Sequence, residues 1–241
     1  MDYTKLDKLT YAELRDMAIQ MDLRVRRSKV GLIEEISEAF REYEEYKHEK
    51  IDKYKKEQIA TKSKNSTIYL VSTTNGTKHV MKVFRKHKSS TSLLKEIELQ
   101  MLAIAERASP TILETDTVFK YVVMDRMERN LGDILKEQNG TLSRTQQKQI
   151  IHLYKKLDSA KVFHGDSSIS NYMYIGTKLR IIDFSNAKHI NKLLIKKLGT
   201  KTPNLHLMTF DLVSRLKKMN LHRTSYEYLC KYLTEEQLAQ L

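Results

Sequence analysis

The chain has 241 residues, 40% of them hydrophobic and 30% charged, with only 7 Gly and 2 Pro. This composition excludes collagen-like and disordered chains and leaves room for one medium-sized domain and a small one. The single cysteine (Cys230) excludes an internal disulfide, no apolar run is long enough to cross a bilayer, and the first residues are too polar for a secretory signal. We therefore expect an intracellular protein, in the cytoplasm or nucleus, with no membrane partner.

The net charge of +13 is unevenly distributed along the chain. Residues 1–60 carry 13 Lys and Arg against 14 Asp and Glu, whereas residues 61–241 carry 30 against 16. A basic surface of this size favours polyanions or acidic partners, although a solvated basic face is the commoner explanation.

Two short amphipathic helices are predicted within residues 9–42. Thr10 is the expected N-cap of the first helix, over residues 11–19, and Ser28 that of the second. The apolar residues that recur at helical spacing are Leu14, Met17 and Ala18, then Leu32, Ile33, Ile36 and Phe40. Residues 43–60 are almost uniformly charged, which indicates an exposed helix or a helical linker.

A basic cluster occupies the turn before the second helix and consists of Arg24, Arg26, Arg27 and Lys29. With its flanking helices, this segment resembles a SAP motif, a small helix-turn-helix module often found in chromatin and DNA-repair proteins. The resemblance implies DNA binding through residues 9–42, with contacts to phosphates. A helical hairpin that docks on a protein or caps the next domain has the same spacing and remains the alternative. Binding through so few charges would be weak and steeply salt-dependent.

From about Ile59 the pattern changes to short β-like runs. Strands are predicted on either side of Asn75-Gly76, a strong hairpin signal. The predicted elements from there to the C-terminus are strands at 67–71 and 79–84, a helix at 93–107, a strand at 117–124, helices at 131–136 and 145–160, a strand at 179–183, and helices at 207–219 and 225–240.

The most specific pattern runs from His164-Gly165-Asp166 to Asn171 and is followed by an apolar strand that ends in Asp183. Its order and spacing resemble the catalytic loop and metal-binding motif of protein kinases. Phosphoryl transfer needs a carboxylate that orients the attacking hydroxyl and oxygen ligands for Mg²⁺ on the phosphates. The resemblance implies the first role for Asp166 and the second for Asn171 and Asp183. Taken singly, each of these residues could equally be a turn former or a strand cap.

Further landmarks of the family follow in the expected order. Lys82 stands where kinases place the lysine that holds the ATP phosphates, and Glu96 is its implied ion-pair partner, with Glu98 the less favoured choice. Residues 121–127 resemble the hinge that binds adenine. The implied hinge residues are Met124, in the gatekeeper position, Asp125 and Met127.

Another landmark is Asp211, which stands where kinases have an aspartate that braces the catalytic loop. An equally good explanation is that Asp211 is simply a carboxylate at the N-terminus of its own helix.

Several departures from the family pattern accompany the resemblance. No glycine-rich loop occurs at 60–67, where Lys62 and Lys64 could supply charge instead, and Ser185 replaces the glycine that usually follows Asp-Phe. Ser168 stands where most serine/threonine kinases have a lysine. The chain also lacks an Ala-Pro-Glu element. This reduced pattern is similar to the RIO kinases, the small kinase of the KEOPS complex, aminoglycoside phosphotransferases and compact kinases of large DNA viruses.

We therefore expect an α+β, protein-kinase-like two-lobe fold with a reduced C-lobe, preceded by a small SAP-like helical hairpin. The expected divisions are 1–43 for the hairpin, 44–60 for the charged helical linker and 61–241 for the kinase-like domain. The implied function is an ATP- and Mg²⁺-dependent serine/threonine kinase with a protein substrate, held near DNA and, if viral, acting inside an infected cell. The alternatives are a pseudokinase adaptor that binds DNA and a protein partner, and a small-molecule phosphotransferase.

Overall fold

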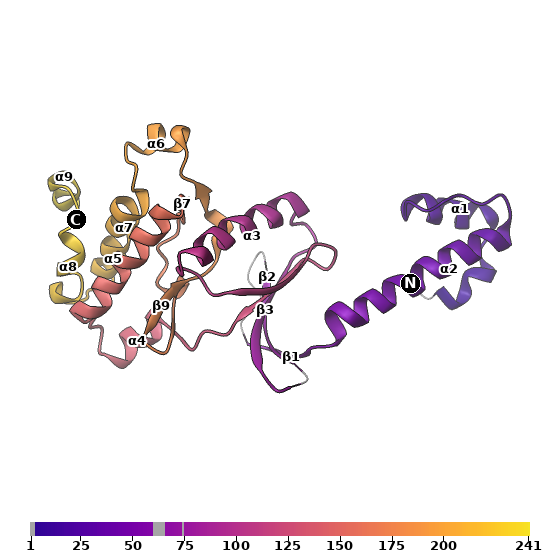
Figure 1. Cartoon of the computed structure of the whole chain (residues 1–241), viewed down its shortest axis with the longest axis horizontal. Helices are drawn as coiled ribbons and strands as arrows, with labels where there is room; N and C mark the ends of the chain where they lie inside the picture. Colours follow the sequence, from indigo (N-terminus) through magenta and orange to yellow (C-terminus); the bar gives the residue numbers. More distant parts are fainter. Residues whose placement is uncertain (1–2, 60–65, 74) are drawn as a thin grey trace. The chain divides into compact units, whose positions relative to one another are not determined.

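The computed structural model describes residues 3–59, 66–73 and 75–241 and has a mixed α+β architecture (Figure 1). It divides into two compact units. The N-terminal unit comprises residues 1–56 with 72–77, and the C-terminal unit comprises residues 57–71 with 78–241. Within the described ranges, no helix is both long and apolar enough to span a membrane.

The helices of the N-terminal unit are η1 (Tyr3–Lys8), α1 (Tyr11–Gln20), α2 (Lys29–Lys47) and the π-helical turn η2 (His48–Asp52). Both predicted N-caps are confirmed, because Thr10 forms a capping box with Glu13 and Ser28 accepts a hydrogen bond from the Gly31 amide. The apolar faces of these helices enclose a small core formed by Leu6, Leu14, Ala18, Leu32 and Ile36.

The charged segment is helical only in its first part. α2 and η2 continue to Asp52, as predicted, but residues 55–58 form the strand β1 (Lys55–Gln58). All four residues of this strand are exposed, and it lies at the edge of a sheet next to β2. An edge position tolerates charged side chains on a strand, so pairing overrides the helical preference of this sequence.

A five-stranded sheet has the order β1-β2-β3-β5-β4. Its other strands are β2 (Ser66–Ser72), β3 (Lys78–Phe84), β4 (Ile112–Asp116) and β5 (Tyr121–Asp125), and the helix α3 (Ser90–Ala105) connects β3 with β4. The predicted hairpin is confirmed, since β2 and β3 are neighbours and Gly76 has a φ of +82°. A small cluster beneath α3 joins Phe84, Leu93, Val122 and Met124.

One predicted strand, at 117–124, is wrong over its first half. Residues 117–120 form a turn between β4 and β5, in which the Asp116 carboxylate accepts hydrogen bonds from the amides of Val118 and Phe119 at 2.8 and 2.7 Å. Lys120 completes the turn with a φ of +54°. An aspartate that caps its own following amides favours a turn over a continuous strand.

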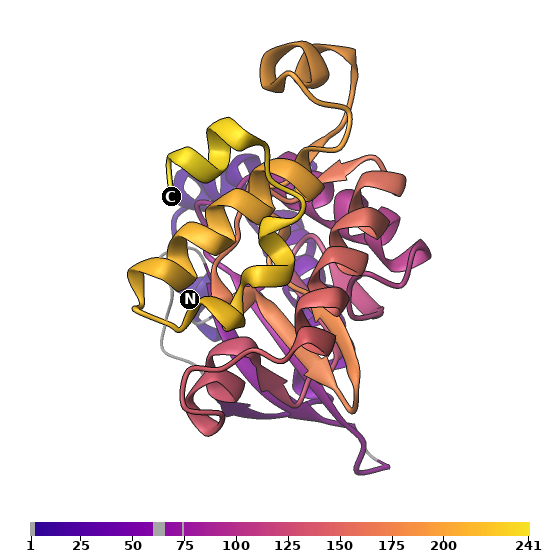
Figure 2. The ribbon, with the colours of Figure 1, turned by 90° about the vertical axis from the view of Figure 1, so that its left-hand side faces the viewer.

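The rest of the C-terminal unit is mainly helical (Figure 2). Its helices of one turn or more are α4 (Leu131–Glu137), α5 (Arg144–Ser159), α6 (Lys192–Leu198), η5 (Asn204–Met208), α7 (Thr209–Lys218), α8 (Glu227–Cys230) and α9 (Glu235–Ala239). Its short strands are β6 (Arg129–Asn130), β7 (Val162–Phe163), β8 (Tyr172–Ile175), β9 (Lys178–Ile181) and β10 (Lys188–His189). Single 3₁₀ turns are η3 (Ile169–Asn171), η4 (Phe184–Asn186) and η6 (Arg223–Ser225). The main hydrophobic core lies among these elements and includes Leu131, Tyr154, Ile181 and Leu212.

Two details of this region differ from the prediction. The helix expected over 225–240 is interrupted, because Thr234 starts α9 with a capping box of its own. In addition, Asn191 and Gly199 delimit the unpredicted helix α6, none of whose residues is buried. α6 extends away from the other helices in both views (Figures 1 and 2).

Candidate active site

Three side chains from distant parts of the chain meet at Lys82. Its ammonium lies 2.8 Å from Glu96 Oε1 and 2.8 Å from Asp183 Oδ1. β3 supplies Lys82, α3 supplies Glu96 and the end of the β9 segment supplies Asp183. The side chains of Lys82 and Glu96 are 11% and 6% exposed, so their interaction is well shielded from water. The predicted Lys82–Glu96 ion pair is therefore present.

The electrostatics of this cluster favour the charged forms. Burial opposes the charge on Lys82, but the carboxylates of Glu96 and Asp183 outweigh it and raise the pKa of the lysine. Burial likewise opposes ionisation of Asp183, whereas Lys82 and hydrogen bonds from Ser185 outweigh it and lower the pKa of the aspartate. Ser185, a departure from the family pattern, thus supports the ionised form of Asp183.

A second lysine, Lys88, reaches the same glutamate and was missed by the sequence reasoning. Its ammonium contacts Glu96 Oε2, and the ammonium groups of Lys88 and Lys82 lie 4.4 and 4.9 Å from the centre of the Phe84 ring. Lys120 fixes the loop that carries Lys88 by donating to the carbonyls of Lys86 and Lys88, at 2.7 Å each. Both oxygens of Glu96 are therefore paired with ammonium groups. A basic run at 85–88 was visible in the sequence, but nothing in it distinguished Lys88.

His164 is the first residue of the predicted catalytic loop, and its side chain is fully buried. Its Nε2 lies 3.0 Å from the Ile182 carbonyl and its Nδ1 lies 3.0 Å from the Asp166 carbonyl, and its ring packs edge-on against Phe184. Burial lowers the pKa of His164, more than the carbonyl contacts and nearby carboxylates raise it. The neutral ring donates only one of the two contacts at a time. His164 thus links the loop to the strand that leads into Asp183.

Gly165, the middle residue of His-Gly-Asp, lies where a side chain would not fit. Its φ is +75°, and a Cβ at this position would lie 3.1 Å from the Asn186 carbonyl oxygen. A close approach of two backbone segments at a positive φ requires glycine. The next residue, Asp166, accepts a hydrogen bond at Oδ1 from the Ser168 amide at 2.9 Å.

Asn171 and Asp183, the two predicted metal ligands, are brought together by the backbone. The Ile182 amide donates to the Asn171 carbonyl at 3.0 Å, which places Asn171 beside the residue that precedes Asp183. Asn171 is 7% exposed, and its side-chain Nδ2 has no hydrogen-bond partner within the described structure. Asp183 has a φ of +67°, an uncommon conformation for a residue other than glycine.

These two residues fit a Mg²⁺ ion that is completed by other ligands. In the described part of the chain, no group of three or more His, Cys, Asp or Glu side chains could hold a metal by itself. Mg²⁺ commonly uses one or two protein oxygens together with phosphate oxygens and water. A buried amide without a partner next to an ionised carboxylate matches that donor set, because the oxygen and nitrogen of an amide are interchangeable by a flip.

Asp211 contacts the predicted catalytic loop through Ser167, whose hydroxyl donates to Asp211 Oδ2. Arg215 completes the group, with its Nε 3.1 Å from Ser167 Oγ and 3.3 Å from Asp211 Oδ2. The second anchor of the loop is Asn204, which the sequence reasoning missed. It accepts from the His164 amide at 3.0 Å and donates to the Val162 carbonyl at 2.7 Å.

The residues of the predicted hinge join the five-stranded sheet to the sheet of β6, β8 and β9. Met124 is buried in β5, and the Asp125 amide donates to the Thr111 carbonyl at 3.0 Å. After the half-buried Met127, the Glu128 amide donates to the Tyr174 carbonyl at 2.8 Å, so the chain has reached the second sheet. In place of the glycine-rich loop, Lys62 and Lys64 lie outside the described residues.

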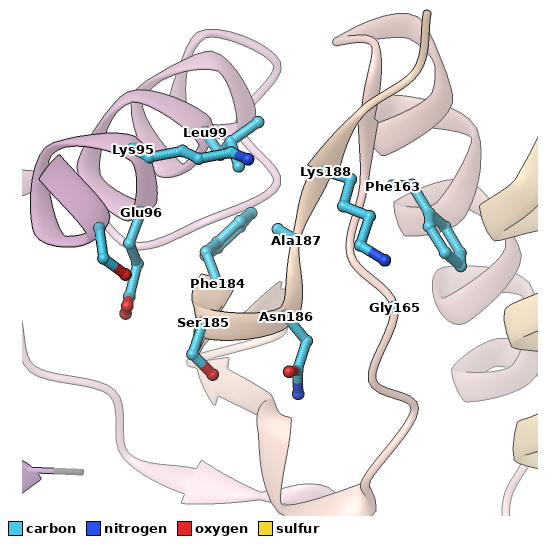
Figure 3. Close-up of a pocket in the computed structure, with 11 residues that line it drawn as sticks. Lys95, Glu96, Leu99, Phe163, Gly165, Phe184, Ser185, Asn186, Ala187 and Lys188 are labelled. Atoms are coloured by element: carbon cyan, nitrogen blue, oxygen red, sulfur yellow. The ribbon is translucent and has the colours of Figure 1, made fainter. Parts of the chain in front are cut away.

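A cavity of about 410 Å³ lies beside α3, next to the cluster of Lys82, Glu96 and Asp183 (Figure 3). Its lining includes Glu96, Leu99 and the segment 184–188, but not Lys82, Asp166 or Asn171. Figure 3 shows the Glu96 carboxylate and the Ser185 hydroxyl extending to the same side, below the Phe184 ring. The cavity therefore adjoins the predicted phosphate site and does not coincide with it.

In the N-terminal unit, all four predicted DNA contacts are exposed. Two of them also have partners within the unit, since Arg26 Nε lies 2.7 Å from Glu35 Oε2 and Lys29 donates to the Asp7 carbonyl at 2.9 Å. Arg24 and Arg27 complete the set. Fewer side chains without a partner are therefore available to contact DNA than the four that the sequence indicates.

No protein-family model and no curated protein sequence matches this chain.

Proposed function

We propose that the chain is a compact protein-kinase-like phosphotransferase that uses ATP and Mg²⁺ and transfers phosphate to serine or threonine hydroxyls of proteins. The observation that carries the proposal is the bridge from Lys82 to both Glu96 and Asp183. Lys82 and Glu96 are largely buried and Asp183 is partly exposed. Burying charged side chains is costly for folding, and such a cluster is useful for holding phosphates.

Each residue has a role that follows from its chemistry. Lys82 supplies a positive charge for the phosphates of ATP, and Glu96 holds that charge in place. Asp166 accepts the proton of the attacking hydroxyl and orients its oxygen. Asn171 and Asp183 would hold the Mg²⁺ ion, which when bound neutralises the negative charge of the phosphates.

Lys88 acts as a positioning residue in this scheme. When Lys82 turns towards phosphates, Glu96 would otherwise be left as a buried carboxylate without a partner, which is energetically costly. Lys88 stays paired with the second oxygen of Glu96 and removes that cost. The lysine therefore supports α3 in a site whose glycine-rich loop is missing.

The test is transfer of radiolabelled phosphate from ATP to the chain itself or to a generic protein acceptor. Asp166→Asn and Asp183→Asn should each abolish transfer, whereas Glu137→Gln, which alters an exposed carboxylate paired with Arg129, should leave it unchanged. Transfer that survives both aspartate substitutions would refute the proposed mechanism.

Nucleotide binding, measured together with phosphate transfer, distinguishes the kinase from a pseudokinase adaptor. A ligand that binds only the folded state must raise the melting temperature, so Mg²⁺-ATP should stabilise the wild-type chain. Stabilisation without transfer would indicate an adaptor that binds nucleotide, and the absence of both would remove the phosphotransferase altogether. An acceptor screen with small hydroxyl-bearing molecules separates a protein kinase from a small-molecule phosphotransferase.

We also propose that residues 9–42 bind DNA, as the SAP-like pattern implies. The support is the exposure of the basic turn, where Arg24 and Arg27 have no carboxylate partner within the described residues. Arg24→Ala with Arg27→Ala should weaken binding to a labelled duplex and reduce its salt dependence by about 2 in log–log slope. Unchanged affinity would favour a hairpin that docks on protein.

A further inference from the structure

A second basic cluster lies in the C-terminal unit and shares no residue with the candidate active site. It consists of Arg107, Lys156, Lys178 and Arg180, which come from the end of α3, from α5 and from β9. The backbone brings these segments together, because the Ile181 amide donates to the Ala108 carbonyl at 2.8 Å. The residues before these two are Arg180 and Arg107, so the two guanidinium groups belong to adjacent chain segments.

Local geometry places the other two cations on the same surface. Lys178 and Arg180 are two positions apart on β9, so their side chains extend from the same face of the strand. On α5, which packs against β9, His152 and Lys156 are four positions apart and share a helix face. Gln149 ties this helix to the β8–β9 turn by donating to the Thr177 carbonyl at 2.9 Å.

Three of the four cations, Lys156, Lys178 and Arg180, line a cavity of about 190 Å³. His152, Lys156, Lys178 and Arg180 line it, together with Thr177 and Gln149. Its apolar lining residues, Leu153 and Leu179, are only 2% and 6% exposed and belong to the core. Neither leucine therefore offers an exposed apolar side chain, and the other residues that line the cavity are charged or polar.

None of the four cations has an ion-pair partner within the described residues. Across residues 3–59, 66–73 and 75–241, no carboxylate forms an ion pair with Arg107, Lys156, Lys178 or Arg180. Burial and the two neighbouring arginines lower the pKa of Lys156, against a weaker opposite effect of Glu106. Burial and Arg107 lower the pKa of Arg180. Like charges are thus held together although they repel each other.

Arg107 also adopts a backbone conformation that its side chain disfavours. It follows α3 with a φ of +55°, and the Ala108 amide donates back to the Ala103 carbonyl at 2.8 Å, as in a helix C-cap of the Schellman type. Glycine or asparagine is the usual residue at such a position. An exposed arginine kept there, beside other uncompensated cations, indicates a role for the charge itself.

We propose that this cluster binds the phosphodiester backbone of a nucleic acid, independently of the basic turn at residues 24–29. Several Lys and Arg side chains spaced over one surface match a linear polyanion, and such contacts need no apolar anchor. An acidic peptide normally adds buried apolar anchors to its charges, and this surface provides none, because Leu153 and Leu179 are already buried.

The experiment measures the anisotropy of short labelled duplex DNA, single-stranded DNA and RNA with the full chain, without nucleotide, between about 50 and 200 mM salt. The test variant combines Arg107→Ala, Lys156→Ala and Arg180→Ala. The matched control combines Arg129→Ala with two substitutions on α6, Lys192→Ala and Lys197→Ala, and so removes the same number of charges from the same unit.

We expect the test variant to bind at least one of these probes roughly tenfold more weakly at the lower salt, with a log–log salt slope smaller by about 2 to 3. The control should bind as the wild type does. In a variant that also carries Arg24→Ala and Arg27→Ala, the two losses should add, because the sites are independent. The probe that loses most affinity identifies whether DNA or RNA is the source of the phosphates.

Equal losses in the test and control variants would overturn the proposal, because net charge alone would then explain binding. Polyglutamate that binds as tightly as the nucleic acid and is equally sensitive to the test variant would also overturn it, in favour of an acidic protein. A variant with Arg107→Lys and Arg180→Lys keeps the charge and should retain most binding, which guards against misfolding of the alanine variant. Binding by Asp166→Asn should be normal, so failure of the kinase proposal leaves this result unaffected.

Discussion

The Lys82 ammonium lies 2.8 Å from Asp183 Oδ1, although 101 positions separate these residues in the chain. The contact connects the five-stranded sheet to the segment after β9, and Glu96 joins it from α3.

Replacing Lys82 with methionine should reduce phosphate transfer by on the order of 100-fold or more, because a preorganised charge facing the phosphates is lost. The loss of stability should be modest, about 1 to 2 kcal/mol, since Glu96 keeps Lys88 and Asp183 is partly exposed to water. Denaturant unfolding and radiolabel transfer measure the two effects. A large loss of stability with unchanged transfer would contradict the assigned role.

Replacing Lys88 with methionine should weaken the positioning of Glu96 without removing the charge that faces the phosphates. We expect a loss of about 1 to 2 kcal/mol in stability and a rise in KM for ATP that exceeds the fall in kcat. Lys86→Met is the matched control, because Lys86 is an exposed lysine of the same loop and should have no effect. Equal behaviour of the two variants would show that Lys88 has no positioning role.

Replacing Gly165 with alanine should destabilise the chain by about 1 to 3 kcal/mol and displace Asp166, because the added Cβ meets the Asn186 carbonyl at a positive φ. Gly176→Ala is a close control. Gly176 has a φ of +56°, but no atom lies within 4 Å of a Cβ placed there. The difference between the two variants in thermal unfolding isolates the close approach from the backbone strain that both share.

His164 should make stability depend on pH in the mildly acidic range. Burial lowers its pKa, so below about pH 6.5 the unfolded chain binds a proton that the folded chain does not. The free energy of unfolding should therefore fall as the pH decreases from 6.5 towards the folded pKa, by up to about 1.4 kcal/mol per pH unit.

His164→Gln should flatten this dependence, whereas the exposed His87→Gln should leave it unchanged. Urea unfolding at a series of pH values provides the measurement. An identical slope for the wild type and His164→Gln would assign the pH effect to other groups.

Local signals predicted much of the fold correctly. The caps Thr10 and Ser28 and the hairpin at Asn75-Gly76 were recognised because a few neighbouring residues determine each of them. β1 was missed, because its charged sequence has no strand-like pattern and it forms a strand only by pairing with β2. α6 was missed although Asn191 and Gly199 mark its ends, because it has no buried face to produce a hydrophobic period.

The candidate site follows the same distinction. The Lys82–Glu96 pair and the proximity of Asn171 to Asp183 were predictable, because the resemblance to an ordered kinase pattern implies which elements meet. Lys88 was not, because its contact with Glu96 depends on how the loop at 85–88 folds and on Lys120, which comes from the β4–β5 turn. The basic cluster around Arg180 likewise arises from three segments that only the tertiary structure brings together.

Two ammonium groups on one glutamate also affect how the chain can be regulated. An outward swing of α3 would have to break both ion pairs of Glu96 together, so two lysines oppose such a movement. If the chain is a phosphotransferase, the amount of the protein and its location would then set how much phosphate it transfers, and not a movement of α3.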